Sequence, residues 1–414
     1  MSWVPPPRPR WVADHNALGE LLGVHSLHPI GADELLATAT ATTALDDFGG
    51  ESWRAGFDRL CAALRDEAGL HAVGALLARS ELLRTLQNRL RIVAALATNP
   101  EVESAPVNSP WFVCGTARSG TSILHELLAQ DPTTRAPAAW ELMYSVPAPR
   151  TSTYASDPRI ALADREVRFW DEITPEYLTM HENGGALPQE CIFITGHEFA
   201  SEHWSGVHDV ATYNKWLQRH DLTHAYRWHR RHLQWLQSEH PAEQWVLKAP
   251  SHLSALPALF SVYPDAWIVQ THRDPLRTVP STISLMATLR WMRSDRVDVD
   301  RLARTMSTGV AMLFDFVRSA RLDGTLPDDR FIDVRYADLL RDPVATIRGI
   351  YERTGRAFTP EYAAAIPAYL AAKPQAKHGA HHYTLDDFAL DAGDLRDRYG
   401  PYCDAYRIEP EGER

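Results

Sequence analysis

The stretch that decides the fold is residues 111–130, which read WFVCGTARSGTSILHELLAQ. It begins with a short apolar run, passes through a polar turn at 115–122, and continues with apolar residues at helical spacing. This order predicts a strand, a loop and a helix. In such a unit the loop N–H groups and the helix N-terminus point at one place, and together they attract an anion.

The loop carries groups that suit a phosphate or a sulfate. Gly115 and Gly120 permit a close approach or a positive φ, Arg118 is a cation, and Thr121 and Ser122 carry hydroxyls. The two glycines have the spacing of a P-loop, but Thr121 stands where a P-loop has its lysine. An enzyme of ATP or GTP is therefore a poor fit. An ordinary turn between a strand and a helix is the alternative at this stage.

Composition limits the class of protein. The chain has 414 residues, 45% of them apolar, so it is long enough to bury a large core. Its net charge of −11 argues against a nucleic-acid partner, although a local basic cleft is compatible with it. Four cysteines lie far apart with no CxxC pair, which predicts a cytoplasmic protein without a disulfide framework or a metal site. No apolar run approaches the ~18 residues of a membrane span, so we expect no integral membrane part.

Two regions are expected along the chain. Residues 1–105 predict a helical N-terminal extension, and residues 106–414 predict an α/β domain. Apolar spacing indicates long helices over 70–97 and 211–238. After residue 244, short apolar strands alternate with helices, which predicts a parallel sheet with helices on both faces.

Polar residues follow three of the expected strands, whose carboxyl ends meet at one edge of a parallel sheet. The first loop carries Arg118, the second carries Lys248 and His252, and the third carries Arg273, with Ser281 eight residues later. Eight residues are about two helical turns, so the Ser281 hydroxyl can point back to the strand end. A guanidinium binds phosphate through two parallel hydrogen bonds, so Arg273 and Ser281 together suit a phosphate.

These residues carry a resemblance to a known family. GTARSGTSIL at 115–124 resembles the 5′-phosphosulfate-binding loop of sulfotransferases that use 3′-phosphoadenosine 5′-phosphosulfate (PAPS), and THRDPLRTVPS at 271–281 resembles their 3′-phosphate-binding element. LKAPSHL at 247–253 and GAHHYTLDDFAL at 379–390 are similar to the bacterial branch of the family. The resemblance covers roughly 110–390. It implies a P-loop-like α/β fold related to nucleotide kinases, and transfer of a sulfuryl group to a hydroxyl or an amine.

The resemblance also implies roles for single residues. Arg118 takes the place of the loop's usual lysine, where it would bind the bridging and 5′-phosphate oxygens and stabilise the leaving group. Arg273 and Ser281 would hold the 3′-phosphate. The other PAPS contacts that the resemblance implies are Ser119, Gly120, Thr121, Ser122, Lys377, His378 and Gly379.

The general base has more than one candidate. Cytosolic members of the family use a histidine just after a lysine; here the turn reads Lys248-Ala-Pro-Ser-His252, so the histidine is displaced by two residues. Lys248 would lie on the transferring group. Other branches use a glutamate shortly after the first helix, a position that Glu141 fits. Glu190 and His181 are further candidates.

We therefore expect a PAPS-dependent sulfotransferase that needs no metal and acts on a small acceptor. Aromatic residues between 140 and 235 predict either an apolar acceptor pocket or core. A P-loop-type kinase of a small molecule and a non-catalytic nucleotide-binding protein of the same fold are the alternatives. The oligomeric state is open, and a homo-oligomer is compatible with the sequence.

Overall fold

A five-stranded parallel sheet lies at the centre of the computed structural model, which describes residues 3–373, 379 and 381–411. Its order is β2-β3-β1-β4-β5, and all neighbouring strands run parallel. The strands are β1 (Trp111–Cys114), β2 (Thr134–Arg135), β3 (Gln244–Lys248), β4 (Trp267–His272) and β5 (Phe331–Arg335). The parallel α/β fold expected from the sequence is confirmed.

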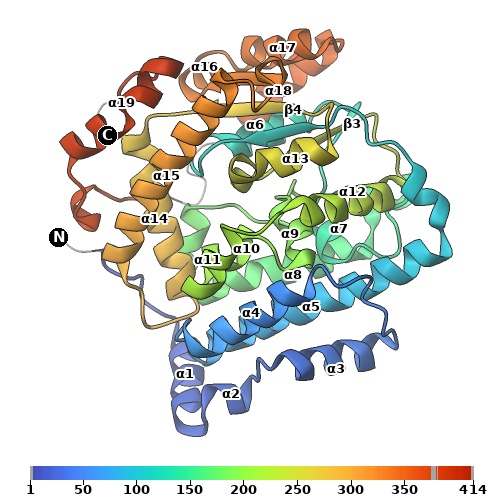
Figure 1. The fold of residues 1–414 in the computed structure, drawn as a ribbon, viewed down its shortest axis with the longest axis vertical. Coiled ribbons are helices and arrows are strands. Elements are labelled where there is room, and N and C mark those ends of the chain that lie inside the picture. The colour runs from blue at the N-terminus through green and yellow to red at the C-terminus, as the bar shows by residue number, and fades with distance from the viewer. Residues whose placement is uncertain (1–2, 374–378, 380, 412–414) are drawn as a thin grey trace.

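Helices cover both faces of this sheet (Figure 1). Side chains alternate along β1, so that Trp111 and Val113 pack with Leu124 on one face, and Phe112 packs with Leu259 on the other. The helices that follow β1 are α6 (Thr121–Leu128), α7 (Ala139–Met143), α8 (Pro158–Ile173), α9 (Ile192–Thr195), α10 (Glu202–Val207), α11 (Ala211–Leu217), α12 (Thr223–Gln237), α13 (Leu256–Val262), α14 (Pro275–Trp291), α15 (Val299–Leu322), α16 (Tyr336–Arg341), α17 (Pro343–Thr354), α18 (Pro360–Ala372) and α19 (Ala392–Tyr406).

The N-terminal region is helical. Its helices are α1 (Arg10–Leu22), α2 (Val24–Leu27), α3 (Ala32–Thr43), α4 (Arg54–Asp66) and α5 (Ala72–Thr98). The long helix expected over 70–97 is α5, which packs against α1 and α3 along one side of the molecule (Figure 1). Phe57 and Leu86 of this region share a core with Phe199 and Tyr213. The domain boundary near residue 105 stays a prediction.

The helix expected over 211–238 is two helices, α11 and α12, with a break between them. At the break the Asp221 carboxylate accepts the Thr223 N–H at 2.9 Å, which satisfies a donor at the start of α12. The apolar pattern continues across the break and so does not show that one helix ends and another begins. The Asp-x-Thr sequence is the local signal for the start of α12.

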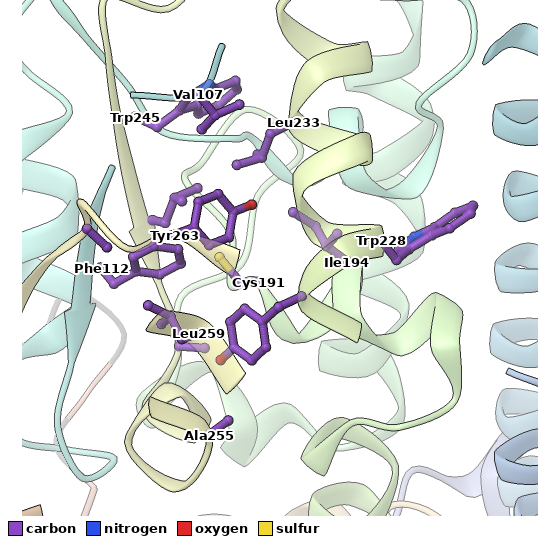
Figure 2. Close-up of a cluster of buried hydrophobic side chains, with 14 of the residues drawn as sticks. Val107, Phe112, Cys191, Ile194, Trp228, Leu233, Trp245, Ala255, Leu259 and Tyr263 are labelled. Carbon is purple, nitrogen blue, oxygen red and sulfur yellow. The ribbon is translucent and has the colours of Figure 1, made fainter. Parts of the chain in front are cut away.

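Large aromatic residues fill the core beneath the sheet. Phe112 of β1 lies against Tyr263, with ring centroids 5.4 Å apart, and Cys191 lies close by (Figure 2). Among the aromatics whose role the sequence left open, Trp140, Phe199 and Trp204 are fully buried. These three residues belong to the core.

The strand order has its switch point between β1 and β4. The chain leaves β1 toward β2 on one side and leaves β4 toward β5 on the other. Ligands of open α/β sheets bind at such a point, at the carboxyl ends of the strands. The loops at 115–120 and 273–274 therefore flank the expected site. In the described part of the chain, no helix is both long and apolar enough to span a membrane.

Candidate active site

The loop between β1 and α6 is tightly built. Gly120, at the start of α6, has a φ of 94°, and a Cβ there would lie 2.5 Å from the Tyr336 ring. A Cβ on Gly115 would lie 2.2 Å from Thr271 Oγ1 of β4. Arg118 also has a positive φ, 69°, a conformation that costs a non-glycine residue about 1–3 kcal/mol and that gathers at functional sites. Packing against β4 and Tyr336 thus holds the loop in a strained shape.

The loop hydroxyls have different partners. Ser119 is buried; its hydroxyl donates to the Thr116 carbonyl at 2.6 Å and lies 2.6 Å from Thr271 Oγ1, so it serves the loop itself. Ser122 accepts a hydrogen bond from Lys248 Nζ at 3.2 Å. Thr121 is buried in the first turn of α6. Ser122 is therefore the loop hydroxyl that the structure joins to the second predicted strand end.

The Arg118 side chain reaches the residues that follow β4. Its Nε donates to Ser281 Oγ at 3.2 Å, and its Nη1 donates to the Met180 carbonyl at 2.5 Å. Arg273 Nη1 donates to the backbone carbonyl of Arg118 at 3.0 Å. Burial lowers the pKa of the Arg118 guanidinium, and the nearby Arg273 charge acts in the same direction. The fold thus gathers Arg118, Arg273 and Ser281 at one place.

A carboxylate from the C-terminal segment lies on Arg273. The Nε and Nη2 atoms of Arg273 donate to the two carboxylate oxygens of Glu411 at 2.7 and 2.8 Å. The Glu411 backbone N–H donates to Asp274 at 2.8 Å, and Arg277 donates to the Glu411 carbonyl at 3.2 Å. The Arg273 guanidinium also lies 4.2 Å from the centre of the Tyr336 ring. Neither Glu411 nor Tyr336 was predicted from the sequence to lie at this site.

Lys248 forms a buried ion pair at the end of β3. Its Nζ lies 2.5 Å from Glu190 Oε1, and Lys248 is only 2% exposed. Burial opposes ionisation of Glu190, but the Lys248 ammonium outweighs it and holds the pKa of the carboxyl below its ordinary value. His181 lines a small cavity with Lys248, and burial lowers its pKa to about 4. Of the base candidates, Glu190 is the one that touches Lys248.

The two leading base candidates, His252 and Glu141, are buried and bond to other side chains. His252 is buried; its Nδ1 lies 2.7 Å from the Tyr226 hydroxyl, and burial lowers its pKa well below the ordinary value. Glu141 is fully buried, where it pairs with Arg135 and accepts the Tyr154 hydroxyl at 2.7 Å. Glu141 also accepts the Ala138 N–H at 2.7 Å, which caps α7. These contacts favour a structural role for Glu141.

The basic segment near residue 378 can be followed only in part. Lys377 and His378 lie outside the described residues. Gly379 is described with a φ of 103°, and a Cβ there would lie 3.6 Å from the Thr179 side chain. Beyond it, His381 Nε2 lies 2.9 Å from the Ser284 hydroxyl of α14. The chain after residue 380 therefore runs along the helix that carries Ser281.

A mostly apolar cavity of about 250 Å³ adjoins the loop. Thr116, Ala117 and Glu190 lie on its wall beside the loop. Its apolar wall comes from α10, α14 and α15, and includes Val207, Leu285, Met286, Met306, Val310 and Leu313. An apolar molecule in this cavity can present a polar group to Glu190.

The histidines in the middle of α12 do not gather ligands for a metal. His229 and His232 are both buried; His229 Nδ1 lies 2.8 Å from the Tyr263 hydroxyl, and His232 Nε2 lies 2.8 Å from the Ser145 hydroxyl. Within the described ranges, no group of three or more His, Cys, Asp or Glu side chains is placed to hold a metal ion.

Two solved structures with this architecture are sulfotransferases. The solved structure of sulfotransferase STF9 from Mycobacterium avium superposes with a TM-score of 0.84 and 30% identity, covering 92% of this chain and 98% of that one. Sulfotransferase STF1 from Mycobacterium tuberculosis H37Rv gives a TM-score of 0.79 and 30% identity, over 89% of this chain and 98% of that one.

A curated protein of Mycobacterium bovis, omega-hydroxy-beta-dihydromenaquinone-9 sulfotransferase Stf3, is 26% identical over 321 residues, which are 74% of this chain and 79% of the relative. The model of the sulfotransferase family matches residues 110–360, more than half of the chain and all five strands of the sheet. This chain is a member of the sulfotransferase family.

Proposed function

We propose that this enzyme transfers the sulfuryl group of PAPS to a hydroxyl of a small, apolar acceptor. The observation that carries the proposal is the meeting of three strand ends. Arg118 after β1 contacts Ser281 and Arg273 after β4, and Ser122 contacts Lys248 at the end of β3. Cations and hydroxyls that converge at the switch point of a parallel sheet suit a ligand with two phosphate groups.

The residues present fit PAPS. Loop N–H groups, Ser122 and the N-terminus of α6 would hold the 5′-phosphosulfate, with Arg118 as the cation. Arg273 and Ser281 would hold the 3′-phosphate, because a guanidinium can give that group two parallel hydrogen bonds. The lack of room for a Cβ at Gly120 keeps the loop close to Tyr336 and supports this cradle. Gly379, with Lys377 and His378, stays a predicted contact.

When bound, PAPS supplies the sulfuryl group. The protein residues position the reacting groups and stabilise the charge that develops during the transfer. In the transfer the acceptor oxygen would form a bond to sulfur, and the bond from sulfur to the 5′-phosphate oxygen would break. Arg118 would stabilise the negative charge that develops on the leaving phosphate, and Lys248 would stabilise the transferring group. Glu190 would take the proton of the acceptor hydroxyl, since its carboxylate lies on Lys248 and on the wall of the apolar cavity.

His252 and Glu141 stay predictions as alternative bases. His252 Nδ1 bonds to Tyr226, and His252 is not among the residues that line the apolar cavity, whereas Glu190 is. The Glu141 carboxylate already has three partners at the start of α7. Glu190 is therefore our assignment.

The acceptor would lie in the cavity beside Glu190. The apolar wall supplied by α14 and α15 favours an apolar body with one reactive hydroxyl. The name of the curated Mycobacterium bovis relative, an omega-hydroxy-beta-dihydromenaquinone-9 sulfotransferase, agrees with an apolar acceptor. A cytoplasmic location, expected from the cysteines, stays a prediction.

Calorimetric titration with adenosine 3′,5′-bisphosphate, and separately with ATP and Mg²⁺, tests the proposal. We expect the bisphosphate to bind and ATP to bind far more weakly. Tight binding of ATP without binding of the bisphosphate would favour the kinase alternative. Binding of the bisphosphate without any turnover of PAPS across a panel of phenols and alcohols would favour the non-catalytic alternative.

A further inference from the structure

A second cavity, of about 220 Å³, adjoins the apolar one. The two cavities share Ile192, Glu202 and Ser251 as wall residues. Neither cavity alone reaches the ~300 Å³ at which ligand sites usually begin, but the two together do. A molecule that extends through both is therefore of ordinary ligand size.

The second cavity has a different chemistry. Its wall carries neutral hydroxyl and amide side chains, namely Thr195, Ser201, Asn214, Gln218, Ser251 and Ser254. Asn214 is half-buried on this wall, and Gln218 is exposed. Each amide and hydroxyl both donates and accepts hydrogen bonds, so this wall matches the hydroxyl groups of a ligand.

Glu202 stands where the two cavities meet. It is the first residue of α10, and its side chain remains exposed within the concave surface. One carboxylate oxygen accepts the Ser254 hydroxyl at 2.6 Å; no ion pair to Glu202 is present among the described residues. Glu202 thus retains the capacity to accept hydrogen bonds from a ligand.

His252 supplies a second unused group. It lies on the wall of the second cavity, 1% exposed, with Nδ1 bonded to Tyr226. Its Nε2 is buried and has no hydrogen-bond partner within the described residues. A buried polar atom without a partner costs about 1–3 kcal/mol, which a ligand hydroxyl would recover.

We propose that the acceptor is bipartite, with an apolar body in the cavity beside Glu190 and a neutral, hydroxyl-bearing head in the second cavity. Glu202, at the junction, and His252 recognise this head and act as specificity residues. The inference rests on the proposed function for the reacting end of the acceptor. It gives His252 a binding role in place of the role of base.

Two phenols test the inference by direct calorimetric binding, without any sulfuryl donor. 4-Hydroxyphenyl β-D-glucoside carries a hydroxylated head, and 4-methoxyphenol keeps the phenol and the para oxygen but lacks the sugar. We expect the glucoside to bind at least about ten-fold more tightly, since hydrogen bonds to a charged group and to unpaired buried groups favour it.

Two variants locate the effect. Glu202→Gln and Asn214→Ala should each reduce the ratio of the two dissociation constants by about five-fold or more, whereas Glu361→Gln, on the exposed side of α18, should leave it unchanged. Equal affinity of the wild type for the two phenols would overturn the inference. So would an undiminished ratio in both Glu202→Gln and Asn214→Ala. Failure of adenosine 3′,5′-bisphosphate to bind would instead refute the proposed function, since the phenol titrations do not depend on it.

Discussion

Replacement of Glu411 by Gln should strengthen the binding of adenosine 3′,5′-bisphosphate. In the structure the Glu411 carboxylate takes both N–H groups of the Arg273 fork, at 2.7 and 2.8 Å. Those are the donors that the 3′-phosphate would need. The bisphosphate must therefore displace the carboxylate, and the observed affinity is reduced by the free energy of that ion pair.

The magnitude follows from the exposure of the pair. The Arg273 and Glu411 side chains are 18% and 31% exposed, so the pair lies between an exposed ion pair and a buried, charge-assisted hydrogen bond. Such a contact contributes roughly 1–2 kcal/mol. We expect the dissociation constant of the bisphosphate to fall about 5- to 30-fold in Glu411→Gln.

Calorimetry at fixed ionic strength measures the change. Adenosine 5′-monophosphate, which lacks the 3′-phosphate, should bind wild type and Glu411→Gln equally. Glu409→Gln, an exposed carboxylate on the same segment, should leave both affinities unchanged. If Glu411→Gln leaves bisphosphate affinity unaltered, or improves both nucleotides alike, then Arg273 does not hold the 3′-phosphate in competition with Glu411.

Three further predictions concern the loop, the base and acid stability. Gly120→Ala would place a Cβ 2.5 Å from the Tyr336 ring on a residue whose φ is 94°. We expect the free energy of unfolding, measured with denaturant, to fall by about 1–3 kcal/mol, and the bisphosphate to bind more weakly. Gly400→Ala, where a Cβ meets no atom within 4 Å, is the control. Glu190→Gln should lower kcat about 10²- to 10⁴-fold while bisphosphate affinity is retained, and a kcat equal to wild type would exclude Glu190 as the base. Burial lowers the pKa of His229 to about 3, whereas an unfolded histidine titrates near ~6.5. Its folded pKa is depressed, so its contribution is present above pH ~6.5 and is lost, by about 1.4 kcal/mol per pH unit, as the pH falls toward 3. His229→Gln should therefore flatten the pH dependence of unfolding between pH ~6.5 and ~5, and an unchanged slope would contradict this.

Much of the anion site could be predicted from short stretches of sequence. The change from an apolar run to a glycine turn and then to helical spacing located β1, the loop and α6. The spacing from Arg273, in the loop after β4, to Ser281 set the serine about two turns into α14, because helical geometry depends on sequence separation alone. Parallel strands then bring Arg118 to Ser281, as their 3.2 Å contact shows.

The break between α11 and α12 shows the limit of periodicity. Trp216 and Tyr226 both carry the apolar pattern, yet α11 ends at Leu217 and α12 begins only at Thr223, where the Asp221 side chain satisfies a backbone donor. A capping residue inside a continuous pattern is a local signal, but apolar spacing does not record it.

The sequence alone determined a parallel α/β fold and the loops of the predicted anion site, because both depend on patterns a few residues long. The tertiary structure decided which group each charged residue meets: Glu190 lies on Lys248 from 58 residues away, and Glu411 lies on Arg273 from 138 residues away. It also enclosed Glu141 among structural partners and turned His252 toward Tyr226. Partners so distant in sequence are chosen by packing and by the cost of leaving a buried charge unpaired, and neither is written in any local stretch of the chain.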